Sequence, residues 1–192
     1  LCGPGEGGLT PSAMKLEAVR SRSSVPIRVM VRPRAGTFVY DAAEFELMRL
    51  AVAAAVGAGA DGVVLGVLRA DSTLDLPRMA ELIALARPLL VVCHRAFDAT
   101  PDADAALAQL LTLGVDGVLT SGHAPTAREG VKVLARHVVA AKQAGAGVMP
   151  RKQSRSVAGV PVNLHSVATA ILIALVTFMG KWVWGIEGRV TT

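Results

Sequence analysis

Three side chains that carry charge or bind metals follow a strand-like apolar run. In "VVCHRAFD" (91–98), the apolar residues and Cys93 predict a buried strand, and His94, Arg95 and Asp98 come directly after it. A histidine and a carboxylate can together act as general acid and base, so His94 and Asp98 are the catalytic candidates. Two other roles for His94 stay open, as a metal ligand or as a core histidine bonded to the backbone. Arg95 and Asp98 also fit a structural ion pair.

Two more apolar runs end in polar residues. The stretch "VRPRAG" (31–36) brings two arginines after an earlier run, and "LTSG" (119–122) brings a serine after a later one. If these strands are parallel, their carboxyl ends share one rim, where binding residues usually gather. Guanidinium and hydroxyl groups bind oxyanions well. The candidates for holding a small anionic ligand are therefore Arg32, Arg34, Arg95 and Ser121.

The two cysteines, Cys2 and Cys93, are soft ligands of the kind that copper(I) prefers. Neighbouring strand residues point to opposite faces of a sheet, so Cys93 and His94 are not expected to share an ion. Cys2 is better placed if "LC" ends a strand, and it is the metal-binding candidate. Because one thiolate holds copper(I) poorly, Cys2 would need Met30, a second cysteine or a neighbouring subunit. Two distant cysteines and no secretory signal predict a cytoplasmic protein without disulfides.

The elements that must position these residues alternate between strands and helices. Five β-branched runs predict buried strands, at 25–31, 62–68, 89–94, 114–120 and 146–150. Helical patterns lie between them, at 41–60, 75–86, 100–114 and 125–146. Regular alternation predicts an α/β fold, either an open doubly wound sheet or a (β/α)8 barrel. The barrel is favoured because the phosphate-binding GxGxxG and GxxxxGK[ST] motifs are both missing.

The positive charge of the chain is concentrated at its end. The 192 residues carry a net charge of +5, yet residues 1–150 hold 15 Lys or Arg against 14 Asp or Glu, and residues 151–192 hold 5 against 1. With aromatic residues at 4%, a base-stacking surface is not expected, which argues against nucleic-acid binding. Residues 162–179 lack charged side chains and are long enough to cross a membrane. They also fit a buried helix or a tail foreign to the fold.

Several motifs, in one order along the chain, resemble the CutC copper-homeostasis family. They are "EGGLTPS" (6–12), "VMVRPRAGTFVYDAAEFE" (29–46), "GADGVVLGVL" (59–68), "HRAFD" (94–98), "LLTLGVDGVLTSG" (110–122) and "VMP" (148–150). The resemblance covers residues 1–150 and implies a TIM-like barrel, often oligomeric, with a role in copper tolerance or trafficking. It also implies that Cys2 ends the second strand of that barrel.

Two departures from the family pattern predict an incomplete barrel. The first strand of the family, with the cysteine that would pair with Cys2, does not precede "LC", and the glycine-rich loop expected after Pro150 is replaced by Arg151 and Lys152. We therefore expect a partial barrel over residues 1–150 and a divergent apolar segment over 151–192. A chain tethered to a membrane by residues 162–179, or without function, is a third hypothesis.

Two functions follow from these observations. The resemblance implies a cytoplasmic protein that binds copper(I) and is not an enzyme. The polar rim instead favours a barrel enzyme, or a former enzyme, that acts on a small anionic substrate, because imidazole, guanidinium and carboxylate groups are not soft ligands. We expect copper handling, with the enzyme as the alternative.

Overall fold

The computed structural model describes residue 5 and residues 7–150, and these belong to one compact unit. The predicted tail at 151–192, its candidate membrane helix at 162–179 and the metal-ligand candidate Cys2 lie outside the described residues. Within the described residues, no helix is long and apolar enough to cross a membrane.

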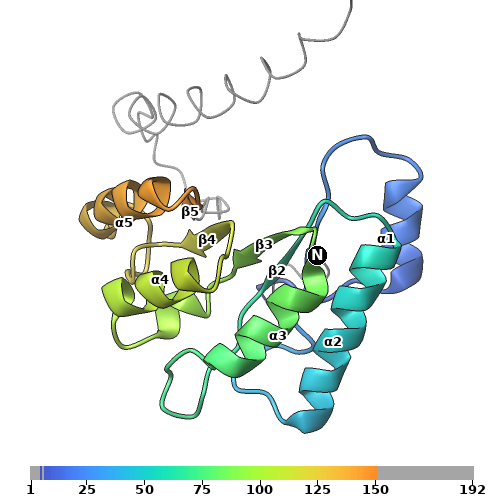
Figure 1. The fold of residues 1–192 in the computed structure, drawn as a ribbon, viewed down its shortest axis with the longest axis horizontal. Helices are drawn as coiled ribbons and strands as arrows, with labels where there is room; N and C mark the ends of the chain where they lie inside the picture. Colours follow the sequence, from blue (N-terminus) through green and yellow to red (C-terminus); the bar gives the residue numbers. More distant parts are fainter. Residues whose placement is uncertain (1–4, 6, 151–192) are drawn as a thin grey trace, which may run out of the picture. The chain divides into compact units, whose positions relative to one another are not determined.

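Five parallel strands form one sheet. They are β1 (Arg28–Met30), β2 (Gly62–Leu65), β3 (Leu90–Cys93), β4 (Gly117–Thr120) and β5 (Gly147–Pro150), and each pairs with the next along the chain. Because the strand order never reverses, the sheet is not doubly wound. The prediction of an α/β fold of the TIM-like barrel type is confirmed, with five strands in the described part of the chain (Figure 1).

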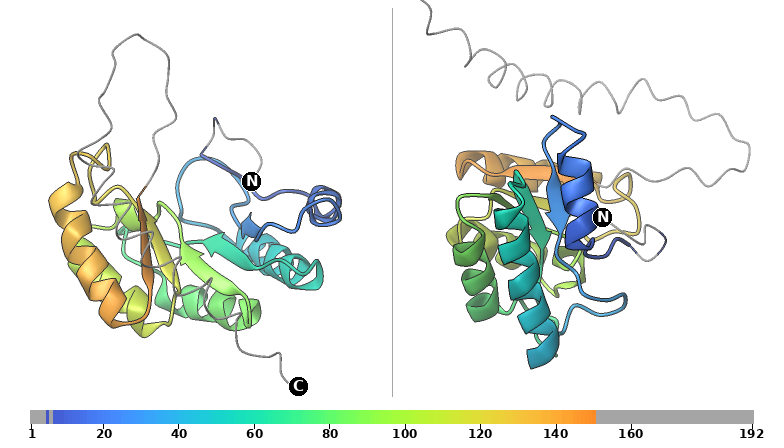
Figure 2. Two further views of the ribbon diagram at one scale, coloured as in Figure 1. Left: turned by 90° about the horizontal axis from the view of Figure 1, so that it is seen from above. Right: turned by 90° about the vertical axis from the view of Figure 1, so that its right-hand side faces the viewer.

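Helices connect the strands and lie around one side of the sheet. They are α1 (Ala13–Arg20), α2 (Ala42–Gly57), α3 (Leu76–Ala86), the short 3-10 helix η2 (Phe97–Ala99), α4 (Ala103–Thr112) and α5 (Val131–Gln143). Figure 2 shows the strands curving in chain order with the helices outside them. This is the arrangement of a barrel wall, in which right-handed crossovers place every helix on the outer face.

The main apolar core fills the space between the sheet and the outer helices. Alternate strand residues point into it, including Val63, Leu65 and Val91, which are fully buried. Met48 and Leu82 meet them from α2 and α3. Strand residues alternate between faces, so the intervening positions point toward the inside of the barrel wall. That inner face carries the functional candidates.

The segment before α5 differs from the prediction. The pattern predicted a helix over 125–146, but α5 begins at Val131, and residues 122–130 form bends and turns. Gly130, which precedes the helix, packs closely against the backbone of Ser121 in the loop leaving β4, and the helix begins after this contact.

Candidate functional site

Strand register places Arg32 and His94 on the inner face, on either side of Gly66. The residues Met30, Val64, Val92, Gly117 and Gly147 pair across the five strands in one row. Two positions further along β1, β2 and β3 come Arg32, Gly66 and His94, which face the same way. Because Gly66 has no side chain, the two polar side chains can approach each other above the middle strand.

His94 is buried, with 2% of its surface exposed, and its ring lies over Gly66. A Cβ on Gly66 would stand 2.8 Å from both Cε1 and Nδ1 of the ring. Nδ1 accepts a hydrogen bond from the backbone N–H of Ala96 at 3.2 Å, so the proton of the neutral ring is on Nε2. Nε2 is buried and has no hydrogen-bond partner among the described residues. Burial, reinforced by the positive charge of Arg32, lowers the pKa of His94 to about 3.

Arg32 is 7% exposed and is held at the end of β1 by backbone contacts. Its guanidinium donates to the carbonyl oxygens of Gly36 at 3.0 Å and Gly8 at 3.4 Å. The guanidinium lies 5.1 Å from the centre of the Phe38 ring, and that ring lies 4.8 Å from the His94 ring. Phe38 therefore links the two polar groups, and sequence reasoning missed both this residue and Gly66.

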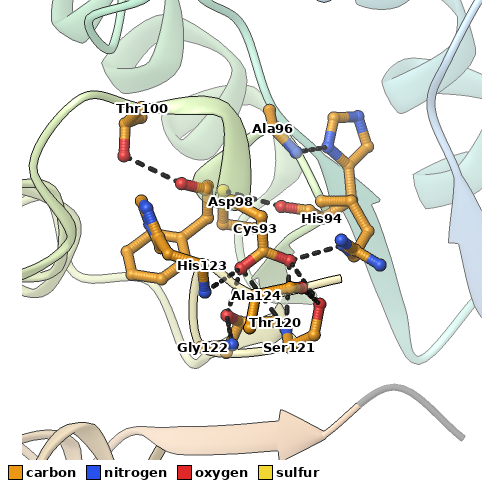
Figure 3. Close-up of polar contacts among 12 residues, drawn as sticks. Cys93, His94, Ala96, Asp98, Thr100, Thr120, Ser121, Gly122, His123 and Ala124 are labelled. Atoms are coloured by element: carbon orange, nitrogen blue, oxygen red, sulfur yellow. Dashed lines mark hydrogen bonds and ion pairs between the residues drawn. The ribbon is translucent and has the colours of Figure 1, made fainter. Parts of the chain in front are cut away.

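Asp98 has a structural role that joins two successive loops (Figure 3). Its side chain is 6% exposed and forms an ion pair with Arg95. The carboxylate also accepts hydrogen bonds from the Thr120 hydroxyl, the backbone N–H and hydroxyl of Ser121, and the backbone N–H of His123. These contacts tie the Asp98 carboxylate to the loop after β4. The structure brings Asp98 together with Ser121 and Arg95, but shows no contact between Asp98 and His94.

The other predicted ligand-binding residues use their polar groups internally. Arg34 forms an ion pair with Glu44. Its guanidinium also donates hydrogen bonds to carbonyl oxygens of the loop that follows it, those of Ala35, Thr37 and Val39. The Ser121 hydroxyl contacts the carbonyl oxygen of Ala124 at 2.9 Å as well as Asp98. The geometry therefore singles out His94, whose buried Nε2 has no partner among the described residues, with the charge of Arg32 acting on it. The roles of Arg32, Arg34, Arg95 and Ser121 in binding stay predictions.

A close backbone contact fixes the loop after β4. Gly122 has a φ of +72°, and a Cβ on Gly130 would stand only 1.9 Å from the carbonyl oxygen of Ser121. No L-residue other than glycine fits at either position without moving the loop.

We expect Gly130→Ala to lower the free energy of unfolding by about 1–3 kcal/mol, because the new methyl group overlaps the backbone of Ser121. Urea unfolding followed by circular dichroism measures this change. Gly57→Ala is the matched control, since its Cβ would meet nothing within 4 Å at the end of α2 and alanine there should leave stability unchanged or slightly raised. A Gly130→Ala variant as stable as the unaltered chain would show that the loop yields without cost.

Two more histidines gather around Phe97, outside the predicted site. The Phe97 ring meets His123 edge-on at 4.9 Å and His137 at 5.6 Å. Nε2 of His137 lies 2.9 Å from an oxygen of Asp104. Burial lowers the pKa of His123, against the opposing effect of Asp98. Sequence reasoning missed this cluster, because the two histidines are fourteen positions apart in the sequence. They come near each other only because both rings pack against Phe97 in η2.

The described residues hold no group of three or more His, Cys, Asp or Glu side chains able to bind a metal. Cys93 is fully buried, and burial raises the pKa of its thiol to about 12. Its side chain belongs to the core between sheet and helices, on the face opposite His94, as strand alternation predicted. Met30, the proposed soft partner, is buried on the inner face of β1.

Comparison with known proteins gives a consistent result. The family model described as the CutC family matches residues 1–169, which is nineteen positions beyond Pro150. A CutC protein of Xanthomonas campestris is 48% identical over 146 residues, covering 76% of this chain and 60% of that protein. A human protein named "Copper homeostasis protein cutC homolog" is 42% identical over 165 residues, covering 83% and 60%. The chain thus spans about three-fifths of the length of these relatives.

A solved structure agrees with the fold. The crystal structure of a CutC protein from Streptococcus agalactiae matches with a TM-score of 0.70 and 28% identity, over 75% of this chain and 71% of that one. The described strands and helices therefore follow a known CutC fold. From the family model, which covers most of the sequence, and from relatives more than 40% identical, it follows that this chain belongs to the CutC family.

Proposed function

We propose that this chain takes part in copper homeostasis and that it binds copper(I). Membership of the CutC family supports the first part, together with the name of the human relative. Copper(I) is a soft ion that thiolate and thioether ligands prefer over oxygen ligands, so cysteine and methionine are the residues to consider. Handling of copper in the cytoplasm stays part of the proposal.

Cys2 is the residue we propose as the copper ligand. The observation that favours it is the state of the other cysteine, because Cys93 is fully buried and its raised pKa keeps it a neutral thiol at pH 7. Thr10, eight positions after Cys2 in the sequence, lies at the rim. Its backbone N–H donates to the carbonyl oxygen of Arg32 at 3.0 Å, and its hydroxyl oxygen accepts from the Arg32 backbone N–H at 2.8 Å. Met30 at the end of β1, or a second copy of the chain, would complete the set of copper ligands.

Anaerobic titration with copper(I) against a competing chelator tests this proposal. We expect stoichiometric binding by the full chain, unchanged binding by Cys93→Ala, and complete loss of stoichiometric binding by Cys2→Ala, because removing the thiolate leaves only weaker ligands. Retention of tight binding by Cys2→Ala would disprove the assignment.

A second candidate function is an enzyme, or a former enzyme, acting on a small anionic substrate at the rim. The observation in its favour is the pair formed by Arg32 and His94, with a buried Nε2 that has no partner among the described residues. A histidine whose pKa is about 3 is neutral and only weakly basic at pH 7. Because Nδ1 accepts from Ala96 and the ring proton lies on Nε2, the Nε2 side would act there as a hydrogen-bond donor. Asp98 is hydrogen-bonded to the loop after β4 and does not contact His94, so the two do not form an acid–base pair in this arrangement.

A further inference from the structure

We propose that Arg32 and His94 form a binding site for a small oxyanion, a carboxylate or phosphate group, at the carboxyl ends of β1 and β3. This inference deepens the second candidate function, since it names the ligand class at the same rim. It does not depend on copper binding.

One hydrogen-bond donor of His94 is left without an acceptor among the described residues. The backbone N–H of Ala96 occupies Nδ1, which places the ring proton on Nε2. In this buried residue the Nε2–H group has no acceptor among the described residues. Buried donors are almost always paired, so one without a partner at a strand end marks a place for a ligand atom. What is missing is an acceptor, which means that the ligand supplies oxygen and not a proton.

Among the described residues, Arg32 is the charged group that acts on His94, and it disfavours a second positive charge there. The site therefore combines one fixed cation with one neutral donor. A guanidinium charge near an imidazole N–H is suited to an oxyanion, because the first supplies positive charge, the second supplies a directed donor, and neither offers a free acceptor.

The lack of a side chain at Gly66 lets the His94 ring lie directly over the backbone of β2. A Cβ on residue 66 would stand 2.8 Å from two atoms of the ring, so no side chain fits there. Phe38 contacts both groups from the loop after β1 and is only half-buried. The pair is thus next to a side chain that reaches solvent, and the Phe38 ring offers an apolar surface for the rest of the ligand.

Two substitutions of His94 distinguish the role of Nδ1 as acceptor from the role of Nε2 as donor. In His94→Asn the side-chain oxygen can replace Nδ1 as acceptor for the Ala96 N–H, but the donor at Nε2 is lost. In His94→Gln the longer amide can place an N–H near the position of Nε2. Arg49→Ala removes an exposed arginine of α2 and serves as the charge control.

Isothermal titration of the full chain with inorganic phosphate and with oxalate, at constant ionic strength, measures binding. We expect saturable binding of at least one of the two, with the preferred anion showing whether a tetrahedral or planar group fits. Binding should be about tenfold or more weaker in His94→Asn, partly restored in His94→Gln and unchanged in Arg49→Ala. Equal affinity in His94→Asn and the unaltered chain, or binding of neither anion, would overturn the proposal.

A measurement on the unaltered chain guards against variants that do not fold. In the proton–nitrogen spectrum of the histidine rings, the Nε2–H signal of His94 should shift when the bound anion is added, because its proton gains an acceptor. An unchanged signal at saturating anion would equally overturn the proposal. The copper titration has a separate outcome, so an anion site that fails leaves the copper proposal standing, and the reverse also holds.

Discussion

Replacing Asp98 with asparagine is expected to lower the free energy of unfolding by about 3–5 kcal/mol, because it breaks a buried ion pair and leaves its partner groups unsatisfied. The carboxylate accepts from the backbone N–H groups of Ser121 and His123 and pairs with the Arg95 guanidinium. An amide keeps the shape but loses the charge and turns an NH2 group toward these donors. Urea unfolding at pH 7, followed by circular dichroism, measures the loss.

Asp102→Asn is the matched control for this prediction. Asp102 is exposed, caps α4 and accepts from the N–H groups of Asp104 and Ala105, and asparagine is an equally good cap. The same chemical change four positions away should therefore leave the urea midpoint nearly unchanged. Similar small effects of both substitutions would show that the charge of Asp98 contributes little to stability.

Acid should destabilise the chain in a range set by His94. Its pKa is about 3 in the folded chain and about 6.5 when unfolded. Above pH 6.5 the ring is neutral in both states, and stability is fully present. As the pH falls below 6.5, His94 becomes protonated in the unfolded chain but stays neutral in the folded chain. The free energy of unfolding should then drop by about 1.4 kcal/mol per pH unit, down to about pH 3.

Urea midpoints at pH 7, 6 and 5 measure this dependence. His94→Gln cannot titrate and should flatten it. His123 has a lowered pKa as well and adds to the same trend, so His123→Gln should reduce the pH dependence only in part. If His94→Gln and the unaltered chain lose stability in parallel, His94 is not the group responsible.

Much of the fold could be predicted because its signals are local. Runs such as "GVVLGVL" are too apolar for a sheet with one solvent-exposed face, and they predict strands that are buried on both faces of the sheet. The helix over Ala42–Gly57 begins where its sequence indicates, since Asp41 and Glu44 form a capping box. The start of α5 could not be placed, because it depends on the contact between Gly130 and Ser121, which tertiary structure creates.

The candidate site could be predicted only to the level of a shared rim. Parallel strands bring Arg32, His94 and Asp98 to the same edge, as expected. Which of them stays available depends on partners far along the chain, such as Ser121 for Asp98 and Glu44 for Arg34. Gly66 did leave a signal, because a glycine inside a strand pattern often marks a close approach of another group.

The hydrogen bonds of Asp98 also bear on motion. In the loop after β4, the backbone N–H groups of Ser121 and His123 donate hydrogen bonds to the Asp98 carboxylate. Asp98 lies in η2, which belongs to the loop after β3. Neither segment can swing away alone, since each would leave buried polar groups behind. The two loops are therefore expected to fluctuate together, on the slower timescale of a joint opening, and to hold the end of β3 still beside them.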